Sequence, residues 1–168
     1  MSAVQEVLAE MREVIAIAGS FDPLHAGHVD HIHKAKALGD HLVVITHPDE
    51  IQVKKKGYCF MPLEDRVAVL LALRDVDQVI VDTVDTDGTV AGQLIMLRPD
   101  VFAKGGDRVA SSMPDREIVA CQAMGIEIVY GVGGLLNSSS RLVEEVVGNY
   151  LASKGLIAAP ERLWMVKP

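Results

Sequence analysis

The chain has 168 residues, of which 49% are hydrophobic and only 4% aromatic, and its formal net charge is −7. This length suits one domain, residues 1–168, with an aliphatic core of its own. The acidic balance argues against a surface that coats nucleic acid, for which a basic stripe is expected. A small anionic ligand stays compatible with it, since that needs only a local positive pocket.

The cysteines and the apolar segments bear on the compartment. The two cysteines, Cys59 and Cys121, do not have the spacing of a disulfide framework or a thiolate zinc site. The N-terminus lacks a signal-peptide pattern, and no apolar run approaches the roughly 20 residues that span a bilayer. We therefore expect a cytoplasmic protein without a membrane partner.

Short apolar runs alternate with helix-like segments along the chain. The runs predict strands over residues 14–18, 41–46, 78–82, 100–104 and 126–130. Helices are predicted over residues 28–38, 62–73, 89–97 and 114–124, and in a last segment that follows 137–140 and runs to about 150. Residues 1–12 show a weak helical period. The tail, 151–168, is less regular, and we expect Trp164 to anchor it.

This alternation favours right-handed βαβ units. The expected fold class is α/β: a single-domain, doubly wound, Rossmann-like sheet of five parallel strands with helices on both faces. In such sheets, ligands bind outside the carboxyl ends of the strands. Four unusual loops follow strands and should meet on that edge: 20–27, the polar and basic segment 48–61, 105–108 and 131–140.

The most informative segment is 19–28, Gly-Ser-Phe-Asp-Pro-Leu-His-Ala-Gly-His, which connects the first strand to the first helix. Backbone N–H groups and the positive end of a helix dipole converge at such a turn, which favours a phosphate there. His25 and His28 can donate hydrogen bonds to charge that develops during a reaction. A zinc site made of these two and His31 is disfavoured, because positions i, i+3 and i+6 sweep around a helix.

Five segments, covering about residues 14–148, together resemble the cytidylyltransferase-like nucleotidyltransferase superfamily. Residues 19–28 are similar to its His-x-Gly-His signature, and Leu-Glu-Asp-Arg at 63–66 to a helix that carries an acid and an arginine. Arg-Asp-Val-Asp at 74–77 resembles the interface motif of the dimeric glycerol-3-phosphate cytidylyltransferases. Lys-Gly-Gly-Asp at 104–107 resembles the heptose-1-phosphate adenylyltransferase domain, and the serines at 138–140 fall where the superfamily has Ser-Thr-Thr or Ser-Ser-Ser.

The resemblance implies an enzyme that transfers a nucleoside monophosphate from ATP or CTP to a small phosphorylated acceptor, a sugar or polyol phosphate, and releases pyrophosphate. Positioning and charge neutralisation supply most of such catalysis. Mg²⁺ is expected on the triphosphate, and a homodimer is expected. The alternatives are an enzyme like pantetheine-phosphate adenylyltransferase, or a nucleotide-binding sensor without turnover.

The resemblance also implies roles for individual residues. The expected catalytic residues are His25, His28 and the loop lysines Lys54, Lys55 and Lys56. The expected nucleotide-binding residues are Gly19, Ser20, Phe21, Asp22, Gly27, Lys104, Gly105, Asp107, Ser138, Ser139 and Ser140. Arg66 and Arg108 are expected at the substrate, and no metal ion held by the protein itself is expected.

Several of these residues also have an ordinary structural interpretation. The lysines could form a solvated loop, the serines a helix N-cap and residues 105–107 a turn. Asp22 could orient His25, bind a metal through water or stabilise the turn. Arg74 and Asp77 could form a local i, i+3 pair instead of an interface contact. The arginine that the glycerol-3-phosphate enzymes carry before their Ser-Thr-Thr is here Gly133.

Overall fold

The fold is described from a computed structural model, which covers residues 13–106, 109–134 and 136–157. The predictions for residues 1–12, Asp107, Arg108 and Trp164 lie outside the described residues. The elements, in chain order, are β1 (Val14–Gly19), α2 (Ala26–Lys36), β2 (His41–Thr46), α3 (Asp49–Lys56), α4 (Leu63–Leu71), β3 (Gln78–Val81), α5 (Ala91–Leu97), β4 (Val101–Gly105), the 3₁₀ turn η1 (Ala110–Ser112), α6 (Asp115–Met124), β5 (Glu127–Val132) and α7 (Ser139–Ser153).

The strands form one parallel sheet in the order β3-β2-β1-β4-β5. The direction of winding reverses between β1 and β4, which is where ligands bind in open α/β sheets. β1 and β2 run in register from Val14 opposite His41 to Gly19 opposite Thr46, so the two strands end together. The predicted α/β fold with five parallel strands is confirmed.

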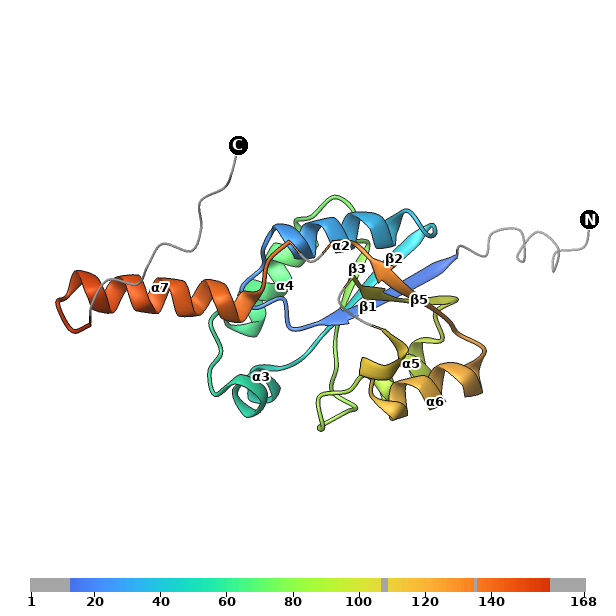
Figure 1. Ribbon diagram of the computed structural model, residues 1–168. Coiled ribbons are helices and arrows are strands. Elements are labelled where there is room, and N and C mark those ends of the chain that lie inside the picture. Colours follow the sequence, from blue (N-terminus) through green and yellow to red (C-terminus); the bar gives the residue numbers. More distant parts are fainter. Residues whose placement is uncertain (1–12, 107–108, 135, 158–168) are drawn as a thin grey trace, which may run out of the picture.

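Alternate side chains of the strands build two apolar clusters, one on each face of the sheet. Ile15 and Ile17 of β1 pack in one cluster with Ile32 of α2, whereas Ala16 belongs to the other cluster, with Leu94 of α5. This alternation follows from the period of two along a strand. Accordingly, α2 lies on one side of the sheet and α5 and α6 on the other (Figure 1), so the predicted cover of both faces is confirmed.

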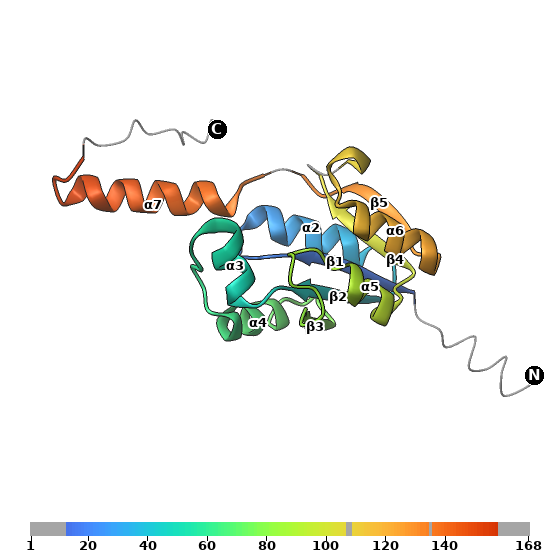
Figure 2. The ribbon, with the colours of Figure 1, turned by 90° about the horizontal axis from the view of Figure 1, so that it is seen from below.

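The last described helix, α7, has no buried residue. It extends away from the rest of the molecule in the views of Figure 1 and Figure 2. Only its first turn is close to the sheet edge at which β1, β4 and β5 end. Across the described residues, no helix is both long and apolar enough to cross a membrane.

Residues 48–61, predicted as one long loop, contain the helix α3, so this prediction is wrong. The first turn of α3 carries the acids Asp49 and Glu50, and its last turn carries the lysines, which complements the helix dipole at both ends. Gly57, at a φ of 82°, ends the helix in the left-handed conformation that glycine adopts without strain. The composition of the segment is polar, but its termini carry helix signals.

The guanidinium of Arg66, on α4, ties these elements together. Its side chain is completely buried and donates five hydrogen bonds of 2.7–3.0 Å, to the backbone oxygens of Ser20, His47 and Met61, the Thr46 hydroxyl and the Asp49 carboxylate. A guanidinium has five N–H donors, and all are in use. The expectation that Arg66 binds substrate is therefore wrong: the residue fixes the ends of β1 and β2 against α3 and α4.

We expect Arg66→Met to lower the free energy of unfolding by about 3–5 kcal/mol, because it leaves buried acceptors and the Asp49 carboxylate unpaired. Urea unfolding measures the loss. Arg74→Met is the matched control: the Arg74 side chain is 89% exposed, so its effect should stay within about 0.5 kcal/mol. Equal stabilities of the two variants would contradict this role of Arg66.

Candidate active site

The two motif histidines lie at the start of α2 with their rings fixed. His25 is the N-cap residue, and its Nδ1 accepts a hydrogen bond of 3.3 Å from the backbone N–H of His28. The two imidazoles stack with their centroids 3.7 Å apart and their planes at 17°. Phe21 contacts His28 edge-on at 5.0 Å. Packing therefore holds both rings in a defined orientation before any ligand binds.

Both histidines are neutral at pH 7. Burial lowers the pKa of His28 to about 3, assisted by the repulsion that a proton on His25 or His31 would bring and by the positive charge of Lys56. Burial likewise lowers the pKa of His25. Within the described residues, His28 Nδ1 is buried and has no hydrogen-bond partner. A polyphosphate bound here would bring negative charge, which raises the pKa of a nearby imidazole.

Two adjoining hollows of about 220 and 320 Å³ lie beside these rings and share His28, His31, Gly105, Ser138 and Ser139. We call them together the histidine cavity. The predicted site residues that line it are Gly19, Ser20, Phe21, His25, Gly27, His28, Lys56, Lys104, Gly105, Ser138, Ser139 and Ser140. The first turns of α2 and α7 both contribute to this lining. Two helix N-termini at one cavity favour an anion there.

The serine segment closes the histidine cavity opposite α2. Ser138 is the N-cap of α7, as one of its two interpretations predicted, and its Oγ accepts a hydrogen bond from the backbone N–H of Arg141 at 3.4 Å. Ser139 Oγ donates to the backbone oxygen of Pro23 at 3.0 Å. The serines thus join α7 to the loop that precedes His25.

Two glycines allow the loops after β4 and β5 to approach closely. A Cβ on Gly106 would lie 2.0 Å from the backbone oxygen of Gly133. Gly133 has a φ of 94°, and a Cβ there would lie 2.9 Å from the Cα of His31. This backbone leaves no room for the arginine that the glycerol-3-phosphate enzymes carry at the position of Gly133.

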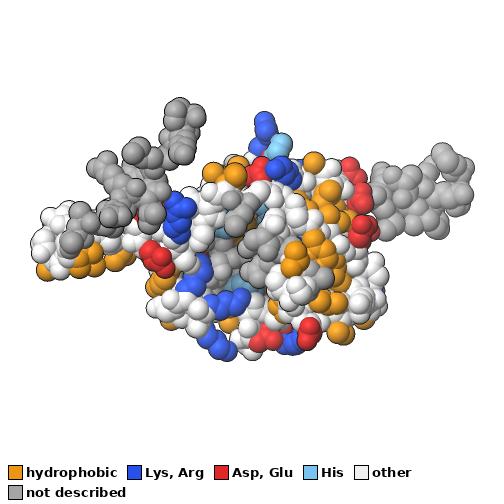
Figure 3. Space-filling model, in the orientation of Figure 1, with side chains coloured by type: hydrophobic (Ala, Val, Ile, Leu, Met, Phe, Trp, Pro, Cys, Tyr) orange, Lys and Arg blue, Asp and Glu red, His pale blue; other side chains and the backbone are white. Residues whose placement is uncertain are grey.

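A second cavity, of about 370 Å³, lies at the ends of β1, β2 and β4, and we call it the lysine cavity. Its charged and polar lining comprises Ser20, His47, Lys55, Asp87, Thr89, Lys104, Ser112 and Glu117. It shares one wall with the histidine cavity: Ala18, Gly19, Ser20 and Lys104 line both. On the face drawn in Figure 3, Lys and Arg side chains gather beside a hollow in which histidine side chains are visible.

Lys104 stands in the shared wall with its ammonium fixed. Its Nζ donates to the Glu117 carboxylate at 3.1 Å and lies 4.4 Å from the centroid of the Phe102 ring. Glu117 also accepts from the backbone N–H of Val90 at 3.2 Å, which orients its carboxylate. An anion on either side of the wall would therefore meet a positioned cation.

The three lysines of α3 diverge. Lys56 Nζ donates to the backbone oxygen of Asp22 at 3.2 Å and lines the histidine cavity. Lys55 Nζ donates to the backbone oxygen of Gly88 at 2.5 Å and lines the lysine cavity. Lys54 donates to the backbone oxygen of Thr86 at 3.4 Å and lines neither. Two of the three predicted lysines are thus brought to the site, one to each cavity.

Asp22 does not face the histidine cavity. Its side chain is fully buried, and its two carboxylate oxygens accept backbone hydrogen bonds from Met61 at 2.7 Å and Phe60 at 3.0 Å. These contacts argue against the expectation that Asp22 binds the nucleotide and favour a structural role. Asp22 holds the segment between α3 and α4 against the first loop.

Sequence reasoning missed the residues that line the lysine cavity beyond its lysines, among them His47, Asp87, Thr89 and Glu117. His47 directly follows β2, and the rule that ligands bind at the carboxyl ends of strands could have identified it. Thr89, predicted to begin a helix, lies in a turn instead, because its N–H and hydroxyl both donate to the Asp87 carboxylate. The helix α5 begins at Ala91.

The chain matches the family model "Cytidylyltransferase-like" over residues 16–131 and belongs to this family. The predicted class, a nucleotidyltransferase, is confirmed at the level of the family. One similar curated protein is the bifunctional protein HldE of Streptomyces coelicolor, 44% identical over 111 residues, which are 65% of this chain and 23% of that protein. Another is the bifunctional protein HldE of Pseudomonas syringae pv. syringae, 37% identical over 150 residues, 87% and 30% of the two chains.

The chain thus spans less than a third of the length of these two relatives. Among solved structures it is similar to a lipopolysaccharide core biosynthesis protein from Thermoplasma volcanium, with a TM-score of 0.62 and 25% identity. That similarity covers 74% of this chain and 99% of the other. The resemblance inferred from the five segments is confirmed.

The lowered pKa of His28 makes the folded state sensitive to acid. The pKa is about 3 in the folded chain against 6.5 as the ordinary value, so between these values the unfolded chain binds more protons. The corresponding stability is present above pH 6.5 and is lost as the pH falls toward 3. On going from about pH 7 to about pH 5, His28→Gln should therefore lose about 1–2 kcal/mol less than the wild type.

Urea unfolding at the two pH values measures this difference. His41→Gln, which changes the first residue of β2, is the control, and its loss of stability should match that of the wild type. If His28→Gln loses as much stability on acidification as the wild type does, the imidazole is not held neutral.

Proposed function

We propose that the chain transfers a nucleoside monophosphate from a nucleoside triphosphate to a small phosphorylated acceptor, a sugar or polyol phosphate, with release of pyrophosphate. The observation that carries this proposal is the wall of Gly19, Ser20 and Lys104 that the two cavities share. A triphosphate in one cavity and an acceptor phosphate in the other would meet across it. Membership of the family supports the same class of reaction.

In this proposal the triphosphate occupies the histidine cavity. The N-termini of α2 and α7 face its phosphates, and the serines at 138–140 offer hydroxyl and N–H donors to the β- and γ-phosphates. His25 and His28 donate to the oxygens of the α-phosphate, where charge redistributes in the transition state. Gly27 permits close approach: a Cβ at this position would already lie 3.1 Å from the His25 ring.

The acceptor phosphate enters from the lysine cavity. One of its oxygens attacks the α-phosphorus in line and forms the new P–O–P bond, while the bond from the α-phosphorus to the bridging oxygen of the leaving pyrophosphate breaks. The attacking oxygen is already ionised, so no general base is required. Lys104 stabilises charge at the point of transfer, and Lys55 and Lys56 neutralise the two substrates from their separate sides.

Mg²⁺ fits this site as a companion of the triphosphate. Among the described residues, no group of three or more His, Cys, Asp or Glu side chains could hold a metal ion. The donor set therefore suits an ion bound mainly by phosphate oxygens and water. Bound in that way, Mg²⁺ would supply additional neutralisation of the phosphate charge.

ATP is the proposed donor and CTP the alternative. The Lys-Gly-Gly of residues 104–106 favours the heptose-1-phosphate adenylyltransferase branch of the resemblance. The name of the Thermoplasma volcanium protein, which refers to the lipopolysaccharide core, supports a sugar-type acceptor. We also propose a cytoplasmic location and a homodimer; light scattering of the purified chain would measure the oligomeric state.

A pyrophosphate-release assay tests the proposed reaction. ATP, CTP, GTP and UTP are each combined with sugar, polyol and pantetheine phosphates in the presence of Mg²⁺. We expect release with ATP and a sugar or polyol phosphate. Release only with pantetheine phosphate would favour that alternative, and tight triphosphate binding without release from any pair would favour the sensor.

His28→Ala should lower kcat by about 100- to 1000-fold, because it removes a donor aimed at the transferring phosphate. His33→Ala is the matched control: His33 lies on the same helix with its side chain 65% exposed. Thermal unfolding should show both variants folded. An unchanged kcat of His28→Ala would remove the imidazole from the mechanism.

A further inference from the structure

A buried pair of polar side chains stands at the edge of the lysine cavity without a role in the reaction described above. His47 follows β2 and is 4% exposed, and Asp82 follows β3 and is fully buried. His47 Nδ1 and Asp82 Oδ2 lie 3.7 Å apart. Neither atom makes a hydrogen bond among the described residues, so the contact between them is electrostatic.

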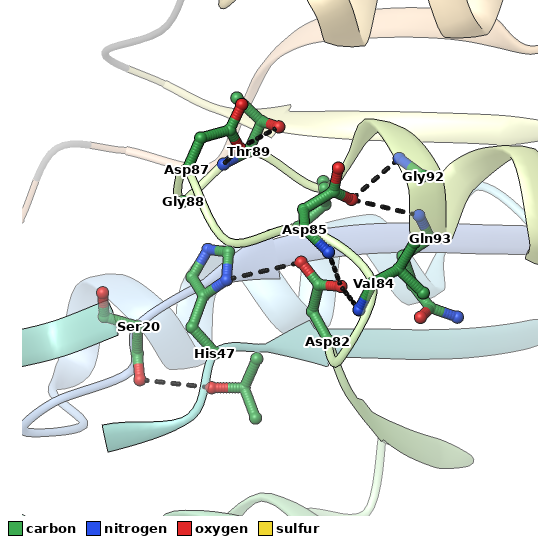
Figure 4. A network of polar contacts seen from close by, with 12 residues as sticks. Ser20, His47, Asp82, Val84, Asp85, Asp87, Gly88, Thr89, Gly92 and Gln93 are labelled. Carbon is green, nitrogen blue, oxygen red and sulfur yellow. Dashed lines mark hydrogen bonds and ion pairs between the residues drawn. The ribbon is translucent and has the colours of Figure 1, made fainter. Parts of the chain in front are cut away.

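The backbone around Asp82 fixes its carboxylate. Asp82 Oδ1 accepts hydrogen bonds from the backbone N–H groups of Val84 at 3.0 Å and Asp85 at 3.1 Å. The next carboxylate, that of Asp85, accepts from Gly92 and Gln93 at the start of α5. This turn leaves Asp82 Oδ2 as the oxygen that faces the imidazole, as Figure 4 shows.

The imidazole is neutral and has one available tautomer. Burial, with the positive charges of Lys55 and Arg66, lowers the pKa of His47 to about 4, so at pH 7 one ring nitrogen carries a proton and the other accepts. An ionised Asp82 carboxylate beside Nδ1 favours the proton on Nδ1, because an ionised carboxylate can only accept a hydrogen bond. The lone pair is then on Nε2.

Nε2 is the nitrogen through which His47 can reach a ligand. Nδ1 is buried against Asp82, while His47 itself lines the lysine cavity with Ser20, Thr89 and Lys104. In Figure 4 one ring nitrogen is turned toward Asp82 and the other away from it. Nε2 of His47, a hydrogen-bond acceptor, thus faces the lysine cavity.

We propose that His47 is a specificity-determining residue; this inference rests on the proposed function. Nε2 of His47 accepts a hydrogen bond from a hydroxyl on the carbon skeleton of the acceptor substrate. Asp82 is the positioning residue that holds the tautomer of His47. The acceptor class is then a phosphomonoester with a hydroxyl on its carbon skeleton. A phosphate on a plain hydrocarbon chain would leave Nε2 of His47 without a hydrogen bond, and such a substrate is therefore rejected.

The test compares hydroxylated acceptors with their hydrocarbon counterparts in the pyrophosphate-release assay: glycerol 3-phosphate with propyl phosphate, ribitol 5-phosphate with pentyl phosphate, and mannose 1-phosphate with cyclohexyl phosphate. For the pair containing the best acceptor, we expect kcat/KM to favour the hydroxylated member by about 100-fold or more. Equal use of both members by the wild type would overturn the proposal.

Three variants test the residue itself. His47→Leu should lose most of this preference and raise KM for the hydroxylated acceptor, with KM for ATP unchanged. His47→Gln, whose amide oxygen can accept in place of Nε2, should restore part of the preference. His41→Leu, at the other end of β2, is the matched control and should keep it. If His47→Leu lowers kcat/KM equally for both members of the pair, His47 has a merely structural role and the proposal is overturned.

A readout that needs no turnover separates this inference from the proposed function. In protein labelled with ¹⁵N in its histidine rings, two-bond ¹H–¹⁵N spectra report the tautomer of each ring, and the His47→Gln variant identifies the signals of His47. We expect Nδ1–H with a free Nε2, whose signal shifts on addition of glycerol 3-phosphate and not of propyl phosphate. A proton on Nε2 would overturn the proposal. Because the spectra are recorded on the wild-type protein, this test holds even if His47→Leu does not fold. Absence of pyrophosphate release from every pair would instead count against the proposed function.

Discussion

The buried guanidinium of Arg66 is the contact on which the geometry of the site depends. It bonds to the backbone oxygens of Ser20 and His47, which follow β1 and β2, and so fixes one residue of the shared wall and one of the lysine cavity. A lysine could not replace it, because its compact ammonium cannot reach acceptors that are spread around the plane of the guanidinium. Its charge also acts at a distance, since it helps to lower the pKa of both His47 and Lys56.

The chain resolves a conflict between an acidic whole and a site for anions. The formal net charge is −7, yet lysines and two helix N-termini converge on the two cavities. Protonated histidines there would repel these groups in the free protein, and burial avoids the repulsion by keeping the imidazoles neutral. The neutral imidazoles nevertheless keep N–H donors, which can bond to phosphate oxygens without adding positive charge to the free site.

Much of the fold could be predicted from the sequence, because five apolar runs separated by helical segments leave few topologies. The motif histidines and the serine cap could be predicted as well, since each follows a strand and opens a helix. The buried, structural roles of Arg66 and Asp22 could not be predicted, because the sequence of a motif does not show whether a charged residue faces a ligand or bonds to buried backbone groups. The helix α3 was missed for a related reason: polar composition indicates exposure, and exposure does not distinguish a loop from a helix. His47 and Asp82 lie 35 residues apart in the sequence, and only the pairing of β2 with β3 brings them together.

The two cavities share a wall from β1 and β4 but differ in the rest of their lining, and this difference has a consequence for specificity. Apart from Lys56 of α3, the histidine cavity is built by β1, β4 and the segments after β1, β4 and β5, and the His-x-Gly-His motif lies after β1. The lysine cavity takes His47 from the end of β2 and Asp87 and Thr89 from the segment after β3. The side chains of His47, Asp87 and Thr89 can change shape and hydrogen-bonding character without moving His25 or His28, because Arg66 bonds to none of these three side chains and holds His47 through its backbone oxygen. In the proposed function, the choice of acceptor is thereby physically separable from the chemistry of transfer, and the Asp82–His47 pair lies on the side where the acceptor is proposed to bind.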